Sequence, residues 1–264
     1  MNDHFIQTTV NQKSGDWSMV ALHSHNYYEM YFLLEGSRQL LFEDKITELE
    51  EGSVAIIAPF TMHKTEGGTF VRVNVCFPEE ALSEISRGNI REISRHSSLH
   101  FKGEDFGKIK DTLYELLSLE QSAERGCIEH KRILTEYLIY LVKTYGVARG
   151  EDDFVTSKGM PSTLLHILRY INCHLHEKIT LGELSERFFL SEVTLCHYFK
   201  KYLGVTFLDY LNALRLAKAK ELLLTTKKSM DEIAAEVGLG SANYFGMFFK
   251  KAVGISPLRF RKIK

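Results

Sequence analysis

Two stretches decide the fold of this chain: Leu195-Cys196-His197-Tyr198-Phe199-Lys200-Lys201 and, fifty positions later, Phe245-Gly246-Met247-Phe248-Phe249-Lys250-Lys251. Each is followed by glycine and a hydroxyl residue, Gly204-x-Thr206 and Gly254-x-Ser256. Upstream, Glu183-Leu184-Ser185 aligns with Glu232-Ile233-Ala234 at an offset of 49, so the second copy has one extra residue in its middle turn. A short amphipathic helix, a turn and a second helix with a polar face make a helix-turn-helix unit. Two such units joined by one long helix predict a protein that enters two major grooves of DNA.

The second helix of each unit is expected to bury one face and offer the other to DNA. Apolar residues recur at helical spacing on the inward faces, which hold Leu195, Tyr198, Phe199 and Tyr202 in the first helix and Phe245, Phe248, Phe249 and Ala252 in the second. The predicted DNA-contacting residues are Val193, Thr194, Cys196, His197, Lys200 and Lys201, and Ala242, Asn243, Gly246, Met247, Lys250 and Lys251. A solvated surface helix is the alternative, but the duplication and the matching Phe-Lys-Lys ends favour a DNA contact.

Charge is divided unevenly along a chain of net charge −1. From Pro161 onward there are 16 Lys and Arg against 9 Asp and Glu, a net charge of +7, and the preceding part carries −8. A basic half on an acidic half indicates a nucleic-acid module joined to a domain that does not touch phosphate.

The composition is that of an ordinary globular protein, with 44% hydrophobic and 25% charged residues. No apolar run is long enough to cross a bilayer, and the start of the chain has no signal-peptide pattern. Four cysteines without paired spacing, Cys76, Cys127, Cys173 and Cys196, indicate reduced thiols. We therefore expect a cytoplasmic protein with no membrane contact.

The N-terminal part is expected to be a β-barrel or sandwich followed by helices. Val71-x-Val73-x-Val75-x-Phe77 alternates as a strand does, and short apolar clusters are separated by Gly36, Gly52 and Pro59. Leu134, Leu138 and Leu141 recur at helical spacing in an expected helix over 125–145, which would pack on the barrel or form a dimer interface.

The predicted fold is a two-domain α+β chain, with a sensor barrel over 1–100, a helical dimerisation segment over 101–149, a linker over 150–160 and an all-α DNA-binding domain over 161–264. The expected helices of this last domain are 162–175, 180–188, 191–202, 206–224, 229–237, 241–252 and 257–263.

The C-terminal residues resemble a known family. Leu195-x3-Phe199-Lys200, Arg215-Leu216-x2-Ala219-x2-Leu222-Leu223 and Gly254-x-Ser256-Pro257-x3-Arg261 are similar to the ordered motifs of the AraC-type double helix-turn-helix domain over nearly all of 161–264. The resemblance implies recognition helices at about 191–202 and 241–252, held in successive major grooves by the helix at 206–224. It also implies a cupin-like sensor domain without catalysis.

The chain departs from the family where base readout is concerned. Members commonly carry an Arg just before the last hydrophobic pair of each recognition helix, and the corresponding residues here are His197 and Met247. Arg reads guanine with two hydrogen bonds, neutral His makes at most one, and Met makes none. Asn243 is then the strong base-reading side chain of the second helix, and adenine is its best match.

The N-terminal motif His23-x-His25-x3-Glu29-x6-Gly36, with Gly52-x6-Pro59-x3-His63, resembles the paired motifs of a cupin barrel. The second motif is truncated, since Thr61 stands where glycine is usual and no Asn follows the histidine. We expect an effector pocket lined by His23, His25, Tyr27, Glu29, Tyr31 and His63, suited to a hydroxyl-rich molecule such as a sugar. Two alternatives remain: His23, His25, Glu29 and His63 bind a divalent metal, or His23 and Glu29 are a structural pair.

The leading interpretation is a ligand-responsive, sequence-specific transcriptional activator without enzymatic activity or resident cofactor. Its expected partners are double-stranded DNA, a small-molecule effector and a second copy of the chain, with RNA polymerase as a further candidate. The alternative is a metal-binding cupin that acts as a metal sensor or as an enzyme with an appended DNA-binding domain. Neither the effector, the promoter sequence nor the choice between activation and repression is encoded in the residue pattern.

Overall fold

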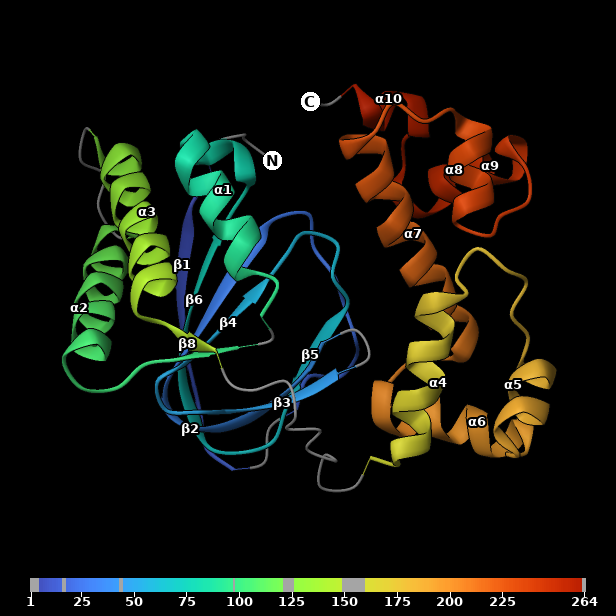
Figure 1. Cartoon of the computed structure of the whole chain (residues 1–264), viewed down its shortest axis with the longest axis horizontal. Helices are drawn as coiled ribbons and strands as arrows, with labels where there is room; N and C mark the ends of the chain where they lie inside the picture. The colour runs from blue at the N-terminus through green and yellow to red at the C-terminus, as the bar shows by residue number, and fades with distance from the viewer. Residues whose placement is uncertain are drawn as a thin grey trace.

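The computed structural model describes residues 5–15, 18–42, 45–96, 98–120, 126–148 and 160–262. An N-terminal antiparallel β domain with helices on one side lies beside a helical C-terminal domain (Figure 1). Residues 150–159 of the expected linker lie outside the described residues. In the described ranges, no helix is both long and apolar enough to cross a membrane.

The sheet is organised around one long strand, β2 (Tyr28–Phe42). Its first part pairs with β6 (Phe70–Phe77) and β4 (Ser53–Ile57), and its second part with β3 (Lys45–Glu50) and β5 (His63–Glu66). On the far side of β6 lies β1 (Gln7–Lys13), and β4 continues to the short strands β7 (Leu99–His100) and β8 (Val147–Ala148). All of these pairings are antiparallel.

The central strands β2, β4 and β6 bury residues on both of their faces. Alternate residues point to opposite faces of a strand, so Met30, Phe32 and Leu34 pack with Val73, Val75 and Phe77 under the helices. On the opposite face, Tyr31, Leu33, Leu40, Leu49, Ala55 and Phe70 form a second cluster. The polar residues between the valines of β6 therefore share this second face.

Three helices cover the outer face: α1 (Glu84–Ile93), α2 (Gly103–Leu119) and α3 (Cys127–Tyr145). Leu138 and Leu141 are buried in the core between these helices and the sheet, and Leu134 packs against its edge. The expectation that these leucines form a dimer surface is therefore wrong, because the same stripe is used to cover the sheet.

The C-terminal domain contains two helix-turn-helix units on either side of α7 (Phe207–Thr225) (Figure 1). The first unit is α5 (Leu181–Phe188) and α6 (Glu192–Tyr198), which continues as a π-helical turn over Phe199–Leu203, and it is preceded by α4 (Ser162–Cys173). The second unit is α8 (Met230–Glu236) and α9 (Ala242–Val253), followed by α10 (Pro257–Arg261).

The sequence duplication reappears in the helix caps. A capping box of Thr180 and Glu183 begins α5, and the matching Ser229 and Glu232 begin α8. A side-chain oxygen at the cap accepts a backbone N–H that the helix itself cannot satisfy, which fixes where the helix starts. The expected helix boundaries of this domain are accurate to within a few residues for this reason.

The two units differ in how their cores are closed. The second unit has a core of its own, built on Ala219, Ile233, Phe245 and Phe249. The first unit shares its core with the β domain, since Leu22, Leu41, Ile46 and Met62 join Leu195 and Phe199 in one cluster. The β domain is thus packed directly on the first helix-turn-helix unit.

Candidate nucleic-acid interface and ligand site

The second helix of the first unit, α6, presents the face that the sequence predicts. Ser191 is its N-cap, with Oγ accepting from the backbone N–H of Thr194 at 3.1 Å. Leu195 and Phe199 are fully buried and fix the helix on the domain. The exposed side chains are Val193, Cys196, His197, Lys200 and Lys201, while Thr194 is half-buried.

The matching helix α9 repeats this arrangement. Ser241 caps it through the N–H of Tyr244 at 3.3 Å, and Phe245 and Phe249 are fully buried. Asn243, Met247, Lys250 and Lys251 are exposed, and Ala242 and Gly246 are half-buried. Ala252 is exposed, so its expected inward position is wrong. Val253, one residue on, packs against the core instead.

Two exposed aromatic side chains of the helix-turn-helix units were not predicted from the sequence as candidate DNA contacts. Tyr244 is 53% exposed on α9 beside Asn243. Phe189 is 93% exposed in the turn between α5 and α6, where its φ of 54° is left-handed. Phe189 could have been noticed in the sequence, because it is an aromatic residue in the turn of a helix-turn-helix unit, where glycine is favoured.

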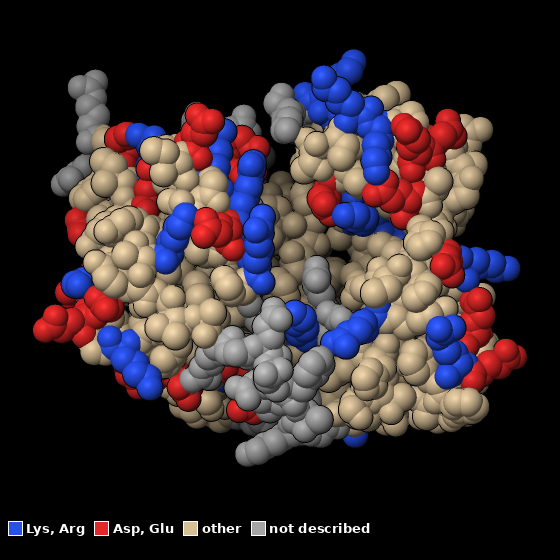
Figure 2. Space-filling view, viewed as in Figure 1, with Lys and Arg blue, Asp and Glu red and all other residues tan. Residues whose placement is uncertain are grey.

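Basic side chains lie at the C-terminal ends of both recognition helices and on α10. Figure 2 shows blue side chains gathered near α10, which carries Arg259 and Arg261. Lys250 and Lys251 end α9, and Lys200 and Lys201 follow α6, so each recognition helix ends in two cations. This placement suits contact with phosphates on either side of a groove.

In the β domain, the structure brings together three of the predicted pocket residues. His25, Glu29 and His63 place ligand atoms within 4.8 Å of one another. Nε2 of His25 lies 3.0 Å from Oε2 of Glu29, and Nε2 of His63 lies 3.9 Å from the same oxygen. Glu29 enters from β2 and His63 from the start of β5, which explains why residues distant in sequence converge.

The orientation of both imidazole rings is set by backbone carbonyls. Nδ1 of His25 donates to the carbonyl of Tyr27 at 2.8 Å, and Nδ1 of His63 donates to that of Thr61 at 3.0 Å. These hydrogen bonds place the proton of each ring on Nδ1 and hold the ring so that its Nε2 faces the Glu29 carboxylate. Burial lowers the pKa of His63 to about 4, although the Glu29 charge opposes this, so its Nε2 carries a free lone pair at neutral pH.

Glu29 remains a carboxylate in this buried position. Burial alone would raise its pKa, but the hydrogen bond from His25 and the nearby His63 and Arg72 hold the pKa below its ordinary value. Its second oxygen, Oε1, accepts from the Asn74 amide at 2.6 Å. One carboxylate oxygen is therefore held in place while the other faces the two histidines.

The other predicted pocket residues take different positions. His23 lies beside the group, with its ring centre 4.2 Å from that of His63, and its buried Nδ1 has no partner among the described residues. Tyr27 stacks on His25 with ring centres 4.0 Å apart. Tyr31 is fully buried on the same face of β2 as Glu29, and its place in the pocket stays a prediction.

Three inward polar residues were missed from the sequence: Arg38, Arg72 and Asn74. Arg38 donates to Thr65 Oγ1 at 3.0 Å, and the guanidinium of Arg72 lies 5.1 Å from the ring centre of Tyr31. Arg72 and Asn74 occupy the positions between the valines of β6. The alternation of that strand marks both faces, so it contained the signal for these two residues.

The helix-turn-helix region matches a family model described as "Helix-turn-helix domain" over residues 184–263. An uncharacterised HTH-type transcriptional regulator, YdeC of Bacillus subtilis, is 25% identical over 97% of this chain and 90% of its own length. The HTH-type transcriptional activator RhaS of an Enterobacter species is 22% identical over 91% of this chain and 87% of its own length. The bifunctional transcriptional activator/DNA repair enzyme AdaA of Bacillus subtilis is 37% identical, but only over 37% of this chain and 46% of its own length.

Proposed function

Because the chain belongs to the AraC family of helix-turn-helix transcriptional regulators, we propose that it is a ligand-responsive, sequence-specific activator. The observation that carries this proposal is the pair of recognition helices, α6 and α9, each fixed by two buried apolar residues and each exposing the face that the duplication predicts. The relatives that span the chain are transcriptional regulators, and we propose a role without catalytic turnover. Four free cysteines suit a cytoplasmic location.

Base reading is assigned to His197 on α6 and Asn243 on α9. Both side chains are exposed, and an amide matches the paired donor and acceptor of adenine in the major groove. Met247 is 66% exposed and suits an apolar contact with a thymine methyl group. Lys200, Lys201, Lys250 and Lys251 bind phosphates, which sets the register of the protein on DNA without selecting sequence.

The effector is assigned to the N-terminal β domain, which we infer is a cupin-like barrel, at the group of His25, Glu29 and His63. Neutral His63 offers an acceptor and Glu29 a charged acceptor for hydroxyl groups. A hydroxyl-rich metabolite such as a sugar matches this set, because each hydroxyl both donates and accepts.

The group is joined to the first recognition helix by short backbone steps. His23 and His63 pair through two backbone hydrogen bonds of 3.1 and 3.0 Å. The next residues contact the end of α6: the backbone N–H of Leu22 donates to the carbonyl of Leu203 at 3.2 Å, and the side-chain Nζ of Lys64 donates to the carbonyl of Tyr202 at 2.9 Å. A ligand that shifts either strand therefore acts on the end of α6, which is a direct route from effector to DNA.

A homodimer is proposed through the outer face of α3. Ile133, Tyr137 and Tyr140 are 56%, 43% and 50% exposed at helical spacing, and the two tyrosine rings lie 6.3 Å apart. A two-fold axis brings the same apolar face of a second copy onto this one, which pairs two DNA-binding domains for two half-sites. RNA polymerase would then contact the DNA-bound dimer.

A divalent metal is the second candidate ligand, favoured by the ring orientations. Imidazoles that bind a metal usually donate their other N–H to a carbonyl or carboxylate, as His25 and His63 do here. The Nε2–Oε2 distances of 3.0 and 3.9 Å bracket the roughly 3.4 Å expected between two ligands of a tetrahedral ion at about 2.1 Å. The ion would take the place of the proton that His25 needs in order to bond Glu29.

The test is a DNA-binding titration of wild type and of Glu29→Gln, both treated first with a chelator, with fluorescence anisotropy as the readout. Neutral sugars are added in one series, and Zn²⁺ or Mn²⁺ in the other. We expect either the sugars or the metal ions to change the DNA affinity of the wild type, and we expect the same addition to leave the DNA affinity of Glu29→Gln unchanged. If neither series changes DNA affinity or thermal stability in the wild type, the ligand-responsive part of the proposal fails. Unfolding of Glu29→Gln would instead make Glu29 a structural residue.

A further inference from the structure

One arginine of the long helix α7 lies at the point where the two helix-turn-helix units meet. Arg215 is 9% exposed and belongs to the motif Arg215-Leu216-x2-Ala219, which lies outside both recognition helices. The preceding residue, Leu214, is buried in the core of the first unit, whereas Leu216 packs against the core of the second unit. The core to which α7 contributes therefore changes at Arg215.

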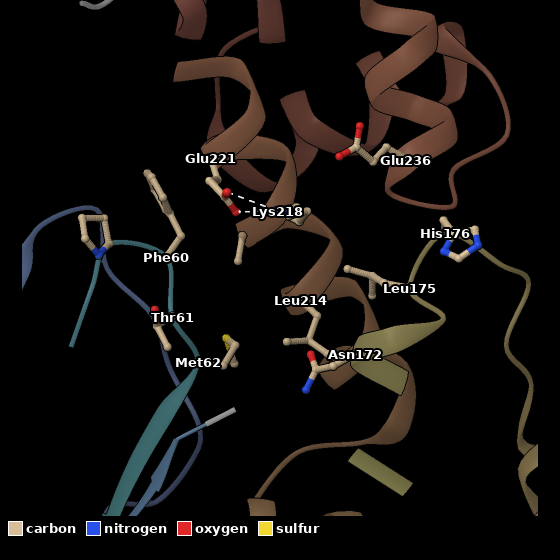
Figure 3. A pocket seen from close by; sticks show the side chains of 12 residues that line it. Phe60, Thr61, Met62, Asn172, Leu175, His176, Leu214, Lys218, Glu221 and Glu236 are labelled. Atoms are coloured by element: carbon tan, nitrogen blue, oxygen red, sulfur yellow. Dashed lines mark hydrogen bonds and ion pairs between the residues drawn. The ribbon is translucent and has the colours of Figure 1, made fainter. Parts of the chain in front are cut away.

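The guanidinium of Arg215 holds the segment that leads into the first unit. Its Nη2 donates to the carbonyl of Glu177 at 2.7 Å, between α4 and α5. Figure 3 shows the start of this segment, Leu175 and His176, beside α7 and close to α8. A side chain of α7 thus fixes the entrance of a unit that begins 38 positions earlier in the chain.

The same guanidinium lies against the turn of the second unit. Gly238, between α8 and α9, has a φ of 70°, and a Cβ there would lie 2.7 Å from Nη2 of Arg215 and 2.5 Å from the carbonyl oxygen of Leu175. A residue without a side chain permits this close approach. Arg215, the entrance of the first unit and the turn of the second unit are therefore in mutual contact.

The charge of Arg215 is not neutralised by its surroundings. Burial lowers its pKa and the nearby Tyr244 phenol on α9 opposes this shift, yet an arginine stays charged in proteins. Its buried Nε has no hydrogen-bond partner among the described residues. Since an unpaired buried charge costs free energy, packing alone does not explain an arginine here. A planar fork of donors that fixes backbone segments does.

We propose that Arg215 is a positioning residue that sets the second recognition helix relative to the first, and thereby the spacing of the two DNA segments that the protein reads. Each unit is held on its own part of α7 by its own core, so the contacts of Arg215 resist a roll of one unit against the other about that helix. A recognition helix reads bases only when its register in the major groove is correct. The inference rests on the proposed reading of DNA by both α6 and α9.

The experiment measures how strongly DNA binding depends on the distance between the two segments. A duplex selected by the full chain is compared with two duplexes that have one base pair inserted or deleted between the two major-groove segments of a half-site. Each base pair turns the second segment by about 34°. Fluorescence anisotropy of the full-length protein should show that wild type prefers the selected spacing by about tenfold, as for one misplaced bidentate base contact, and Arg215→Met by only about threefold.

Arg261→Met is the matched control. Arg261 donates to the carbonyl of Lys228 and also has a buried Nε without a partner among the described residues, but both residues belong to the second unit. This variant should keep the spacing preference of wild type. A loss of stability alone lowers binding to the three duplexes by the same factor, so it does not change their ratio.

Gly238→Ala tests the same contact from the opposite side. Its added Cβ overlaps the carbonyl oxygen of Leu175 and Nη2 of Arg215, whereas Gly240, in the same turn with a φ of 72°, has no atom within 4 Å of its Cβ position. Gly238→Ala should therefore lower the spacing preference, and Gly240→Ala should keep it.

An unchanged spacing preference in a folded Arg215→Met or Gly238→Ala, with folding checked by circular dichroism, overturns the inference. An equal loss of preference in Arg261→Met and Gly240→Ala overturns it too, as does a failure of both Arg215→Met and Gly238→Ala to fold, which would make Arg215 a residue of core stability. If wild type itself binds all three duplexes alike, the proposed reading of DNA by both helices fails, and the inference fails with it. The two failures are therefore distinguishable.

Discussion

Replacing Gly204 by alanine should separate the β domain from the first helix-turn-helix unit. Gly204 follows the π-helical turn of α6 and has a φ of 76°. A Cβ at this position would overlap the carbonyl oxygen of Val20 and lie 3.1 Å from Cα of Ala21. Both are backbone atoms, so no side-chain rotation can relieve the overlap, and the segment Val20–Leu22 has to move.

The second copy provides a matched control at Gly254. This glycine has a φ of 86°, and no atom lies within 4 Å of the position that a Cβ would take. Gly254→Ala therefore carries only the cost of a left-handed alanine, about 1–2 kcal/mol. Gly204→Ala carries the same cost and also breaks the hydrogen bonds from Leu22 to Leu203 and from Lys64 to Tyr202. These bonds contribute about 1 kcal/mol for the neutral pair and about 1.5–3 kcal/mol for the charged donor.

Urea unfolding of the full chain, followed by circular dichroism, measures the difference between the two variants. We expect Gly204→Ala to lose about 2.5 kcal/mol more than Gly254→Ala, the lower end of the range, because water replaces the lost partners. Limited proteolysis should cut Gly204→Ala faster near Val20. Equal losses in the two variants would refute the direct contact between the β domain and the first unit.

Three further predictions concern DNA and the dimer. Lys250→Ala should weaken binding to all DNA sequences alike and reduce the salt slope of log K by about one; a sequence-selective loss in a salt titration would contradict a phosphate role. His197→Ala should cost about 1–3 kcal/mol at one base pair of the site, and a uniform loss across substituted sites would exclude base reading. Tyr137→Lys should turn a dimer into a monomer in sedimentation at micromolar concentration; an unchanged mass would reject the α3 interface.

The C-terminal domain was largely predictable from the sequence because its signals are local. Ser191 and Ser241 cap the recognition helices, and Leu195 and Phe245 occupy equivalent core positions. Caps, glycines and helical spacing act within one or two turns, so a pattern of residues determines them. What the pattern does not contain is the packing of Leu22 and Met62 on this domain, since that contact joins segments far apart in the chain.

The β domain was less predictable because its elements depend on contacts across the sheet. Gly36 looks like a strand end, yet β2 continues through it with a φ of 85° and an irregular register between Leu33 and Glu35. The helix α1 was not expected, since its polar sequence with Gly88 has little intrinsic preference for a helix. A glycine or a polar run can be overridden by the tertiary structure around it.

The candidate ligand site was predicted in its members but not in its arrangement. Motif spacing identified His25, Glu29 and His63, which converge. It also named Tyr31, which is fully buried, with the guanidinium of Arg72 5.1 Å from its ring centre. Spacing along a strand shows which face a residue shares, but its depth in the domain depends on how the sheet curves.

The most direct test of the central claim is a hydroxyl-radical and methylation-protection footprint on a DNA site selected by the full chain. Two recognition helices held by α7 should protect two major-groove segments on one face of the DNA, about 10 base pairs apart, for each protomer. Lys250→Ala should weaken both segments together, because the protein leaves the site as a unit. A single protected segment per protomer, with α9 or α6 making no groove contact, would contradict the double helix-turn-helix mechanism.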